Sequence, residues 1–265
     1  MVNPDYFAVG NPNPEERLRL RGLEMLWDSV TRRRLIAAGI GKGQRCLEVG
    51  AGGGSVVRMM ADLAQTRVVA VDMDPRFLDP NDNRYEVRTL DITSATALEG
   101  EQFDVIHCRF LLMHLLDPSA VLRTFYRRLA PGGFVLIEEP NMHSWAPADP
   151  KAPDADRLDR VIRVSLDAAE IAGVWRNALG PRLQAMLQEV GFTGVECEGT
   201  CWVAADEHPE IMAVITQTLQ LAAASALAAG AISQSELAAT VAVMRARNNR
   251  QVTPTLFGAV GRRQG

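Results

Sequence analysis

Short apolar runs alternate with amphipathic stretches along most of this chain of 265 residues. Runs rich in Val, Ile and Leu suit strands that are buried on both faces, and the stretches between them repeat apolar residues at helical spacing. Strands that alternate with helices favour a doubly wound parallel sheet, because β-α-β crossovers are right-handed. The pattern predicts an α/β fold with strands near 46–49, 67–72, 85–90, 105–108, 134–138, 193–205 and 256–260.

Helix signals divide the remaining chain. Asn13 and Pro14 are a cap and a first helical residue, and Asp117-Pro118 starts a second helix. The link 75–83 holds two prolines and two asparagines, so the helix expected there is reduced to about a turn. Ser233 and Glu236 form a candidate capping box. The predicted helices cover 14–38, 117–130, 154–179, 181–190, 208–229 and 233–247.

A glycine cluster follows the first predicted strand. The stretch Cys46-Leu47-Glu48-Val49 leads into Gly50-Ala51-Gly52-Gly53-Gly54, and a helical pattern begins at Ser55. Glycines allow positive φ and a close approach to a ligand, and the helix start offers unpaired N–H groups. A phosphate loop would need a Lys, and a dinucleotide fingerprint a third glycine at 55 or 57; neither is present. A turn that only joins strand to helix is the simpler alternative.

Acids stand at the ends of the next two predicted strands. Asp72 closes the run Arg67–Val71, and Asp91 follows the strand 85–90. The carboxyl ends of parallel strands form the edge where open α/β sheets bind ligands, and a carboxylate accepts hydrogen bonds from two ribose hydroxyls. Asp72 could instead cap the turn Asp-Met-Asp-Pro.

These motifs together resemble the class I S-adenosylmethionine (SAM)-dependent methyltransferases. The pattern Glu48-x-Gly50-x-Gly52-x-Gly54, the spaced acids and the turn Leu129-Ala130-Pro131-Gly132-Gly133 carry the resemblance, which covers about residues 35–140 well. It implies a Rossmann-like, seven-stranded, mostly parallel sheet, with the last strand antiparallel. It also implies SAM as the cofactor and S-adenosylhomocysteine (SAH) as the product.

The resemblance further implies which residues contact the cofactor. Glu48 would orient the amino group, and the glycine loop would make room for the amino-acid part. Asp72 would hold the ribose with Met73 on the adenine, and Asp91 would bind the adenine amino group with Ile92 on the ring. An amino-terminal residue, Tyr6 or Arg21, would meet the carboxylate. The candidate cofactor residues are Glu48, Gly50, Ala51, Gly52, Asp72, Met73, Asp91, Ile92, Arg109 and Tyr6.

Four regions follow from this interpretation. Residues 1–40 form an amino-terminal arm and helical lid, and 41–140 the SAM-binding Rossmann-like core. Residues 141–180 are longer than a crossover needs, so they are expected as a helical insertion over the active site. Residues 181–265 complete the sheet and carry a helical insertion at 208–247. We expect these added helices to pack into a cap that shapes the substrate pocket.

The chemistry of methyl transfer does not determine which residue acts as the catalytic base. Methyl transfer needs alignment and exclusion of water, and a weakly acidic oxygen nucleophile also needs a base. His143, Glu139 and His107 are the candidate catalytic residues because they lie at or beyond strand ends, with Glu138 as a further candidate. His114 follows Leu112-Met113 in a helix-like stretch and is interpreted as structural. No metal-binding cluster is evident.

Composition and net charge limit the classes of molecule that the protein is expected to bind. The net charge of −4 gives no basic footprint for nucleic acid, so a small-molecule substrate is expected, without nucleic acid or membrane. Its target would be an O or N atom, with a secondary metabolite as one candidate class. The absence of a signal pattern and the four unpaired-looking cysteines favour the cytoplasm, and a homodimer is a candidate assembly. The alternatives are a SAM- or SAH-binding protein without transferase activity and a nicotinamide-dependent oxidoreductase.

Overall fold

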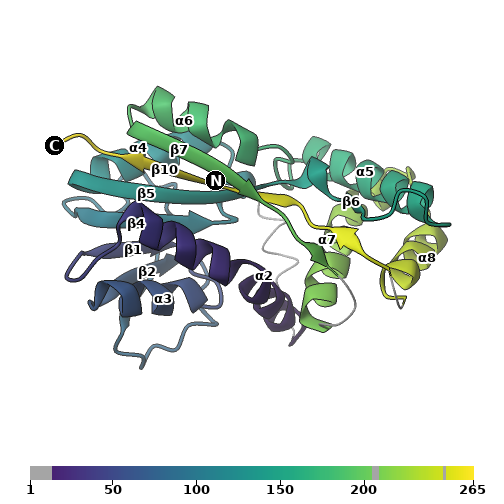
Figure 1. Cartoon of the computed structure of the whole chain (residues 1–265), viewed down its shortest axis with the longest axis horizontal. Coiled ribbons are helices and arrows are strands. Elements are labelled where there is room, and N and C mark those ends of the chain that lie inside the picture. The colour runs from purple at the N-terminus through teal and green to yellow at the C-terminus, as the bar shows by residue number, and fades with distance from the viewer. Residues whose placement is uncertain (1–13, 205–208, 247–248) are drawn as a thin grey trace.

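A seven-stranded sheet forms the centre of the computed structural model, which describes residues 14–204, 209–246 and 249–265. The strand order is β3-β2-β1-β4-β5-β10-β7 (Figure 1). The first five strands are parallel, and β10 is antiparallel to both neighbours, which confirms the mostly parallel sheet. The strands are β1 (Cys46–Val49), β2 (Val68–Asp72), β3 (Tyr85–Thr89), β4 (Phe103–Arg109), β5 (Leu129–Asn141), β7 (Thr193–Thr200) and β10 (Thr255–Arg262).

The alternation along each strand assigns side chains to two separate cores. In β2, Val69 and Val71 belong to one buried cluster, and Val68 and Ala70 belong to the other. Helix α3 (Ser55–Ala64) packs into the second cluster through Val57 and Met60. The helices α4 (Pro118–Arg128) and α6 (Leu183–Val190) cover the opposite face. The sheet is therefore covered on both faces, as its near-continuous apolar strands predict.

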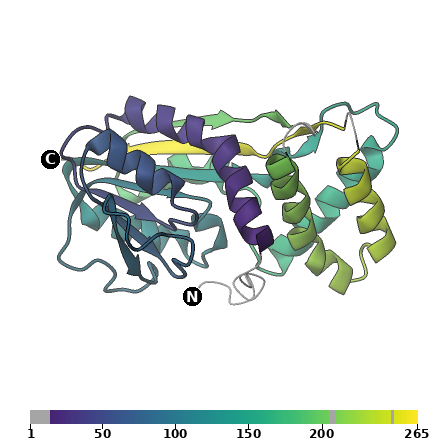
Figure 2. The same ribbon diagram turned by 90° about the horizontal axis from the view of Figure 1, so that it is seen from below.

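A group of helices and a small sheet extend beyond the carboxyl ends of the parallel strands. The helices α5 (Ala155–Ile171), α7 (Pro209–Ala228) and α8 (Gln234–Met244) pack on one another. The small sheet joins β6 (Ala146–Pro147), β9 (Gln251–Val252) and β8 (Val203–Ala204). Helix α2 (Pro14–Ala38) runs from the large sheet to α7, so it links the two parts (Figure 2). We call α5, α7, α8 and the small sheet the cap.

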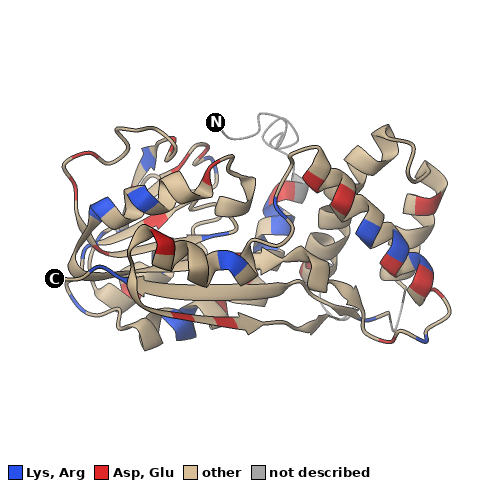
Figure 3. Cartoon of the chain, turned by 90° about the horizontal axis from the view of Figure 1, so that it is seen from above, with Lys and Arg blue, Asp and Glu red and all other residues tan. Residues whose placement is uncertain are grey.

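Helix α7 is unusual in composition. Within the part of the chain that the structure describes, Glu210–Ala228 is the one helical stretch long and apolar enough to cross a membrane, and half of it is buried inside the protein. It packs against both α2 and α5. Its apolar side chains therefore form part of the hydrophobic core of the cap. Charged residues of both signs are interspersed along the ribbon, over the sheet and the cap (Figure 3).

Two sequence predictions about element boundaries were wrong. The predicted strand 193–205 is two strands, because the chain leaves β10 after Thr200 and pairs with β9 in the cap. The predicted helix 154–179 ends at Ile171, where Gly173 adopts a φ of +72°. Other signals were confirmed: Asp117 accepts a hydrogen bond from the N–H of Ala120, and Ser233 with Glu236 forms the capping box. The predicted cap residue Asn13 lies outside the described residues.

Candidate active site

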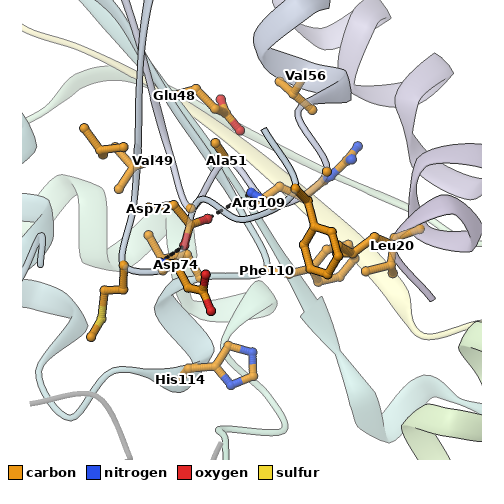
Figure 4. A pocket seen from close by; sticks show the side chains of 18 of the residues that line it. Leu20, Glu48, Val49, Ala51, Val56, Asp72, Asp74, Arg109, Phe110 and His114 are labelled. Atoms are coloured by element: carbon orange, nitrogen blue, oxygen red, sulfur yellow. Dashed lines mark hydrogen bonds between the residues drawn. The ribbon is translucent and has the colours of Figure 1, made fainter. Parts of the chain in front are cut away.

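A cavity of about 240 Å³ opens at the carboxyl ends of β1, β2 and β4 (Figure 4). The amino-terminal half of α2 covers it through Leu20, Leu23 and Glu24. Asp72 and Asp74 lie side by side in it, between Glu48 and His114. We call it the first cavity. Of the candidate cofactor residues, it is lined by Glu48, Gly50, Ala51, Gly52, Asp72, Met73, Ile92 and Arg109.

Hydrogen bonds hold the glycine loop, residues 50–54, against the end of β2. The N–H groups of Gly50 and Ala51 both donate to the carbonyl of Val71, and the N–H of Gly52 donates to Asp72 Oδ2 at 2.9 Å. Gly50 and Gly52 have φ of +73° and +50°. Left-handed backbone is easiest for glycine, which explains the residue type in this turn.

The carboxylate of Asp72 accepts hydrogen bonds from the backbone around it and also lines the first cavity. Its Oδ2 accepts from Gly52, and its Oδ1 accepts from the N–H of Asp74 at 2.9 Å. Each carboxylate oxygen has a second lone-pair site, so both can accept further donors from a ligand. Burial raises the pKa of Asp72, although the backbone donors oppose this shift. The capping interpretation and the ligand interpretation are thus compatible.

Asp91, the third acid of the predicted cofactor motifs, does not line the first cavity. Asp91 is exposed, and its Oδ1 accepts from the N–H and the hydroxyl of Thr93. It is not among the residues that line the cavity, whereas its neighbours Leu90 and Ile92 are. Arg21 is exposed and does not line it either. The predicted contact Tyr6 lies outside the described residues.

A buried ionic chain runs beneath the glycine loop. His107 Nδ1 is 2.6 Å from Glu48 Oε2, and His107 Nε2 is 3.0 Å from Glu138 Oε2. All three side chains are buried. Burial alone would lower the pKa of His107, but the two carboxylates raise it to about 9. His107 is therefore an imidazolium at neutral pH that donates from both nitrogens.

Helix α2 joins this ionic chain. Glu138 accepts from Arg34 Nη1 at 2.7 Å and from the Thr31 hydroxyl. Burial raises the pKa of Glu138, but His107, Arg109 and Arg34 together lower it to about 2. Arg34 can reach inward because β10 carries Gly258, where a Cβ would stand 2.6 Å from the guanidinium carbon. An arginine on an outer helix thus has a buried role that the sequence pattern did not distinguish from a solvated one.

Arg109 completes the connection between α2 and the cavity. Its guanidinium donates to Thr31 Oγ1 at 2.8 Å and to Asp28 Oδ1 at 2.9 Å. The same side chain lines the first cavity and is 8% exposed. The floor of the cavity is therefore a set of paired charges that fix α2 against β4 and β5.

The three predicted catalytic residues lie outside the walls of both cavities that we describe. Glu139 is buried and accepts from the backbone N–H groups of Leu111 and Leu112 at 2.9 and 2.6 Å. Burial raises its pKa to about 8, although these N–H groups lower it. His107 belongs to the ionic chain. His143 lies in the short helical turn Met142–Ser144, where its carbonyl accepts from Arg163.

A second cavity, of 100 Å³, adjoins the first under the cap. Phe110 and His114 line both cavities, and Phe110 adopts a φ of +55° directly after β4. Burial lowers the pKa of His114 to about 4, so its imidazole is neutral at pH 7. Sequence reasoning treated His114 as structural. Its place just after a strand's carboxyl end was the signal that could have indicated it. The residues shared by the two cavities are Arg19, Leu23, Phe110, His114 and Leu221.

Fold and site together define a doubly wound α/β protein with a cofactor-type cavity over a glycine loop and a second cavity beside it. A family model described as a methyltransferase domain matches residues 21–197. That match covers more than half of the chain, so the chain belongs to this family.

Individual relatives support the same family. Methyltransferase str2 of Strobilurus tenacellus is 35% identical over 167 residues, which are 59% of this chain and 58% of that protein. Ubiquinone biosynthesis O-methyltransferase of Pseudomonas putida (strain W619) is 38% identical over 106 residues, which are 37% of this chain and 45% of that protein. The matches thus span only about half the length of these relatives.

A solved structure shows the same fold. Phosphoethanolamine N-methyltransferase 2 of Haemonchus contortus, determined in complex with SAM, aligns with a TM-score of 0.53 at 18% identity. The alignment covers 90% of this chain and 53% of that one. At this identity the likeness establishes the Rossmann-like fold, which agrees with the strand order of the sheet.

Proposed function

We propose that the chain is a SAM-dependent methyltransferase that acts on an O or N atom of a small molecule. The observation that carries this proposal is the pair of adjoining cavities. One is walled by the glycine loop and by Asp72, and the other lies under the cap, with Phe110 and His114 at their junction. Membership of the methyltransferase family supports the same reaction class.

The residues of the first cavity fit SAM. The glycine loop leaves space beside β1, and Asp72 keeps lone pairs for ribose hydroxyls. Met73 and Ile92 offer apolar surfaces for the adenine. Glu48 is held by His107 with its carboxylate at the edge of the cavity, where it would orient the amino group. Arg109 is the candidate partner for the carboxylate.

When bound, SAM supplies an already activated methyl group, so the chain mainly has to position the acceptor. In this proposal the cap shields the junction, and the acceptor would meet the methyl group beside Phe110 and His114, which line both cavities. Burial lowers the pKa of His114 to about 4, so its imidazole is neutral but weakly basic, and its position at the junction is what makes it the candidate to take the acceptor's proton. This geometry favours His114 over His107, Glu139 and His143 as the group nearest to the acceptor.

Calorimetric titration with SAM, SAH and NADH in turn tests the cofactor. We expect SAM and SAH to bind and NADH not to bind. In Asp72→Ala, SAM affinity should fall about 10- to 100-fold, because two hydrogen bonds to a carboxylate contribute about 1–3 kcal/mol. Asp91→Ala is the matched control, since Asp91 lies outside the cavity, and it should retain SAM affinity. Equal affinities in folded Asp72→Ala and wild type would remove the ribose assignment.

Two rival functions are separable. A binding protein without transferase activity would bind SAM and SAH but never form SAH in the presence of any acceptor. A nicotinamide-dependent oxidoreductase would bind NADH and not SAM. The second cavity argues against the first rival, because a regulator needs no acceptor chamber next to the cofactor.

The remaining expectations extend this proposal. The net charge of −4, with residues of both signs interspersed along the ribbon (Figure 3), supports a small molecule over nucleic acid. A cytoplasmic location, the absence of a membrane partner, a homodimer and a secondary-metabolite substrate stay predictions. Gel filtration coupled to light scattering tests the homodimer directly.

A further inference from the structure

The walls of the second cavity are almost entirely apolar. Four aromatic side chains contribute to them from four separate segments of the chain, and aliphatic side chains of α2 and α7 close the space between. The aromatic residues are Trp27, Phe110, Trp145 and Trp175. The aliphatic and methionine residues are Leu23, Leu26, Met113, Met142, Val214, Ile215 and Leu221. Such walls favour a flat, apolar ligand, because aromatic faces pack best on another ring.

The charges around the two cavities differ in sign. Among the described residues that line the second cavity, the ionisable ones are Arg19 and His114, and none is an acid. The first cavity contains five acids: Glu16, Glu24, Glu48, Asp72 and Asp74. Arg19 is paired with Glu16, which lines only the first cavity. The second cavity is thus neutral to positive.

This charge pattern discriminates between acceptors. An alkylamine is protonated at neutral pH, and in the second cavity its charge would lose water without meeting a carboxylate. A phenol or an enol is neutral, so it enters the second cavity without this cost.

We propose that the acceptor is an apolar aromatic molecule that is methylated on a hydroxyl oxygen, and not an amine. This inference rests on the proposed methyl transfer. In the reaction, the oxygen forms a bond to the methyl carbon while the carbon–sulfur bond breaks and sulfur keeps the electron pair. The hydroxyl proton passes to the imidazole of His114. Atoms and charge balance, since the sulfonium becomes a thioether and the imidazole becomes an imidazolium.

Two probes that share a 4-ethylphenyl group test the charge argument: 4-ethylphenol and 4-ethylbenzylamine, each titrated into the SAH-saturated protein at pH 7.5. We expect the phenol to bind at least about 10-fold more tightly than the amine, a difference of about 1.4 kcal/mol. With SAM, the phenol should yield its methyl ether. Equal binding of both probes, methylation of the amine, or binding of neither probe to a protein that binds SAH would overturn the proposal.

A variant that introduces a negative charge sharpens the test. Thr218 lines the second cavity from α7 and is absent from the walls of the first. Thr218→Asp places an acid among the aromatic walls and should abolish the preference for the phenol, with the amine binding about 10-fold more tightly than in wild type. Thr218→Val is the matched control and should keep the preference for the phenol. An unchanged preference in Thr218→Asp contradicts the proposal.

The outcomes separate this inference from the proposed function. Failure of SAM and SAH to bind at all would refute the proposed function. Binding of SAH together with a preference for the amine would leave the methyltransferase proposal intact and refute only the aromatic hydroxyl. SAH titration of each variant reports that the first cavity is intact.

Discussion

The two cavities lie side by side but are built in opposite ways. The first takes about half of its lining residues from two short segments, 48–56 and 71–77, and it contains five acids. The second takes its walls from residues scattered between Arg19 and Pro254, and it is apolar. The first therefore depends on local backbone geometry and a few charges. The second depends on how distant segments pack, which no local motif records.

The ionic chain under the first cavity gives the largest expected difference between the two regions. His107→Leu leaves the carboxylates of Glu48 and Glu138 buried without their shared cation. Loss of one member of a buried ion pair costs about 3–5 kcal/mol, so the free energy of unfolding should fall by about that amount. Denaturant titration measures this loss. SAM affinity should fall as well, because Glu48 loses its partner at the edge of the cavity.

The exposed pair Arg33–Glu198 is the control for this prediction. Arg33→Gln removes an ion pair of similar length in water, where such pairs contribute less than about 1 kcal/mol. Similar losses in the two variants would show that burial of the ionic chain contributes nothing special, and the contrast between the regions would lose its energetic basis.

The pH dependence of stability is the next expected effect. The pKa of His107 is raised from 6.5 to about 9, so its contribution is fully present below pH 6.5 and is lost as the pH rises through 9. The loss is of the order of 3 kcal/mol by the relation between pKa shift and free energy. The lowered pKa of Glu138 acts at the other end: its contribution is present above pH 4.5 and is lost as the pH falls through about 2.

Glu139 adds to the alkaline loss and has to be separated from it. Its pKa is raised to about 8, so its contribution is also lost as the pH rises, between 4.5 and 8. Unfolding curves of Glu139→Gln from pH 6 to 9.5 remove the contribution of Glu139, and they should still slope downward towards pH 9. If the stability of that variant did not change between pH 6 and 9.5, His107 would not be the charged centre of the buried ionic chain.

The sequence predicted the first region much better than the second. The positions that require glycine, the ends of the strands and the spacing of the acids can all be read from short stretches of sequence. The prediction therefore placed Gly50, Gly52, Asp72, Met73 and Ile92 at the cofactor site, and all five line the first cavity. Asp91 followed the same logic, yet its side chain turns to Thr93, because a local Asx-type contact competes with a ligand role.

The cap shows why the remaining prediction was weaker. Its helices were predicted from periodicity, but periodicity gives no partner, so the aromatic walls of the second cavity had no signature. His114 was undervalued because Leu112-Met113 made its segment resemble a helix, whereas Glu139 holds that segment as a short turn by accepting from its backbone N–H groups. That contact joins a residue of β5 to the turn that follows β4, and it could not be inferred from either segment alone.

The smallest expected effect separates backbone cost from ligand contact within the first region. Gly50 and Gly43 have φ of +73° and +81°, so an alanine at either position incurs a similar left-handed backbone cost of about 1–2 kcal/mol. They differ in surroundings: a Cβ on Gly50 would stand 3.4 Å from Leu111 Cδ1, whereas one on Gly43 would meet nothing within 4 Å.

Gly50→Ala and Gly43→Ala should therefore lose similar stability, while only Gly50→Ala loses SAM affinity. The added methyl group would lie at the wall of the first cavity, next to the segment that carries Phe110 and Leu111. We expect a loss of about 10-fold, which corresponds to about 1.4 kcal/mol. If both variants kept full affinity, the glycine loop would be a turn that joins β1 to α3, and the acids at the strand ends would have to hold the cofactor without it.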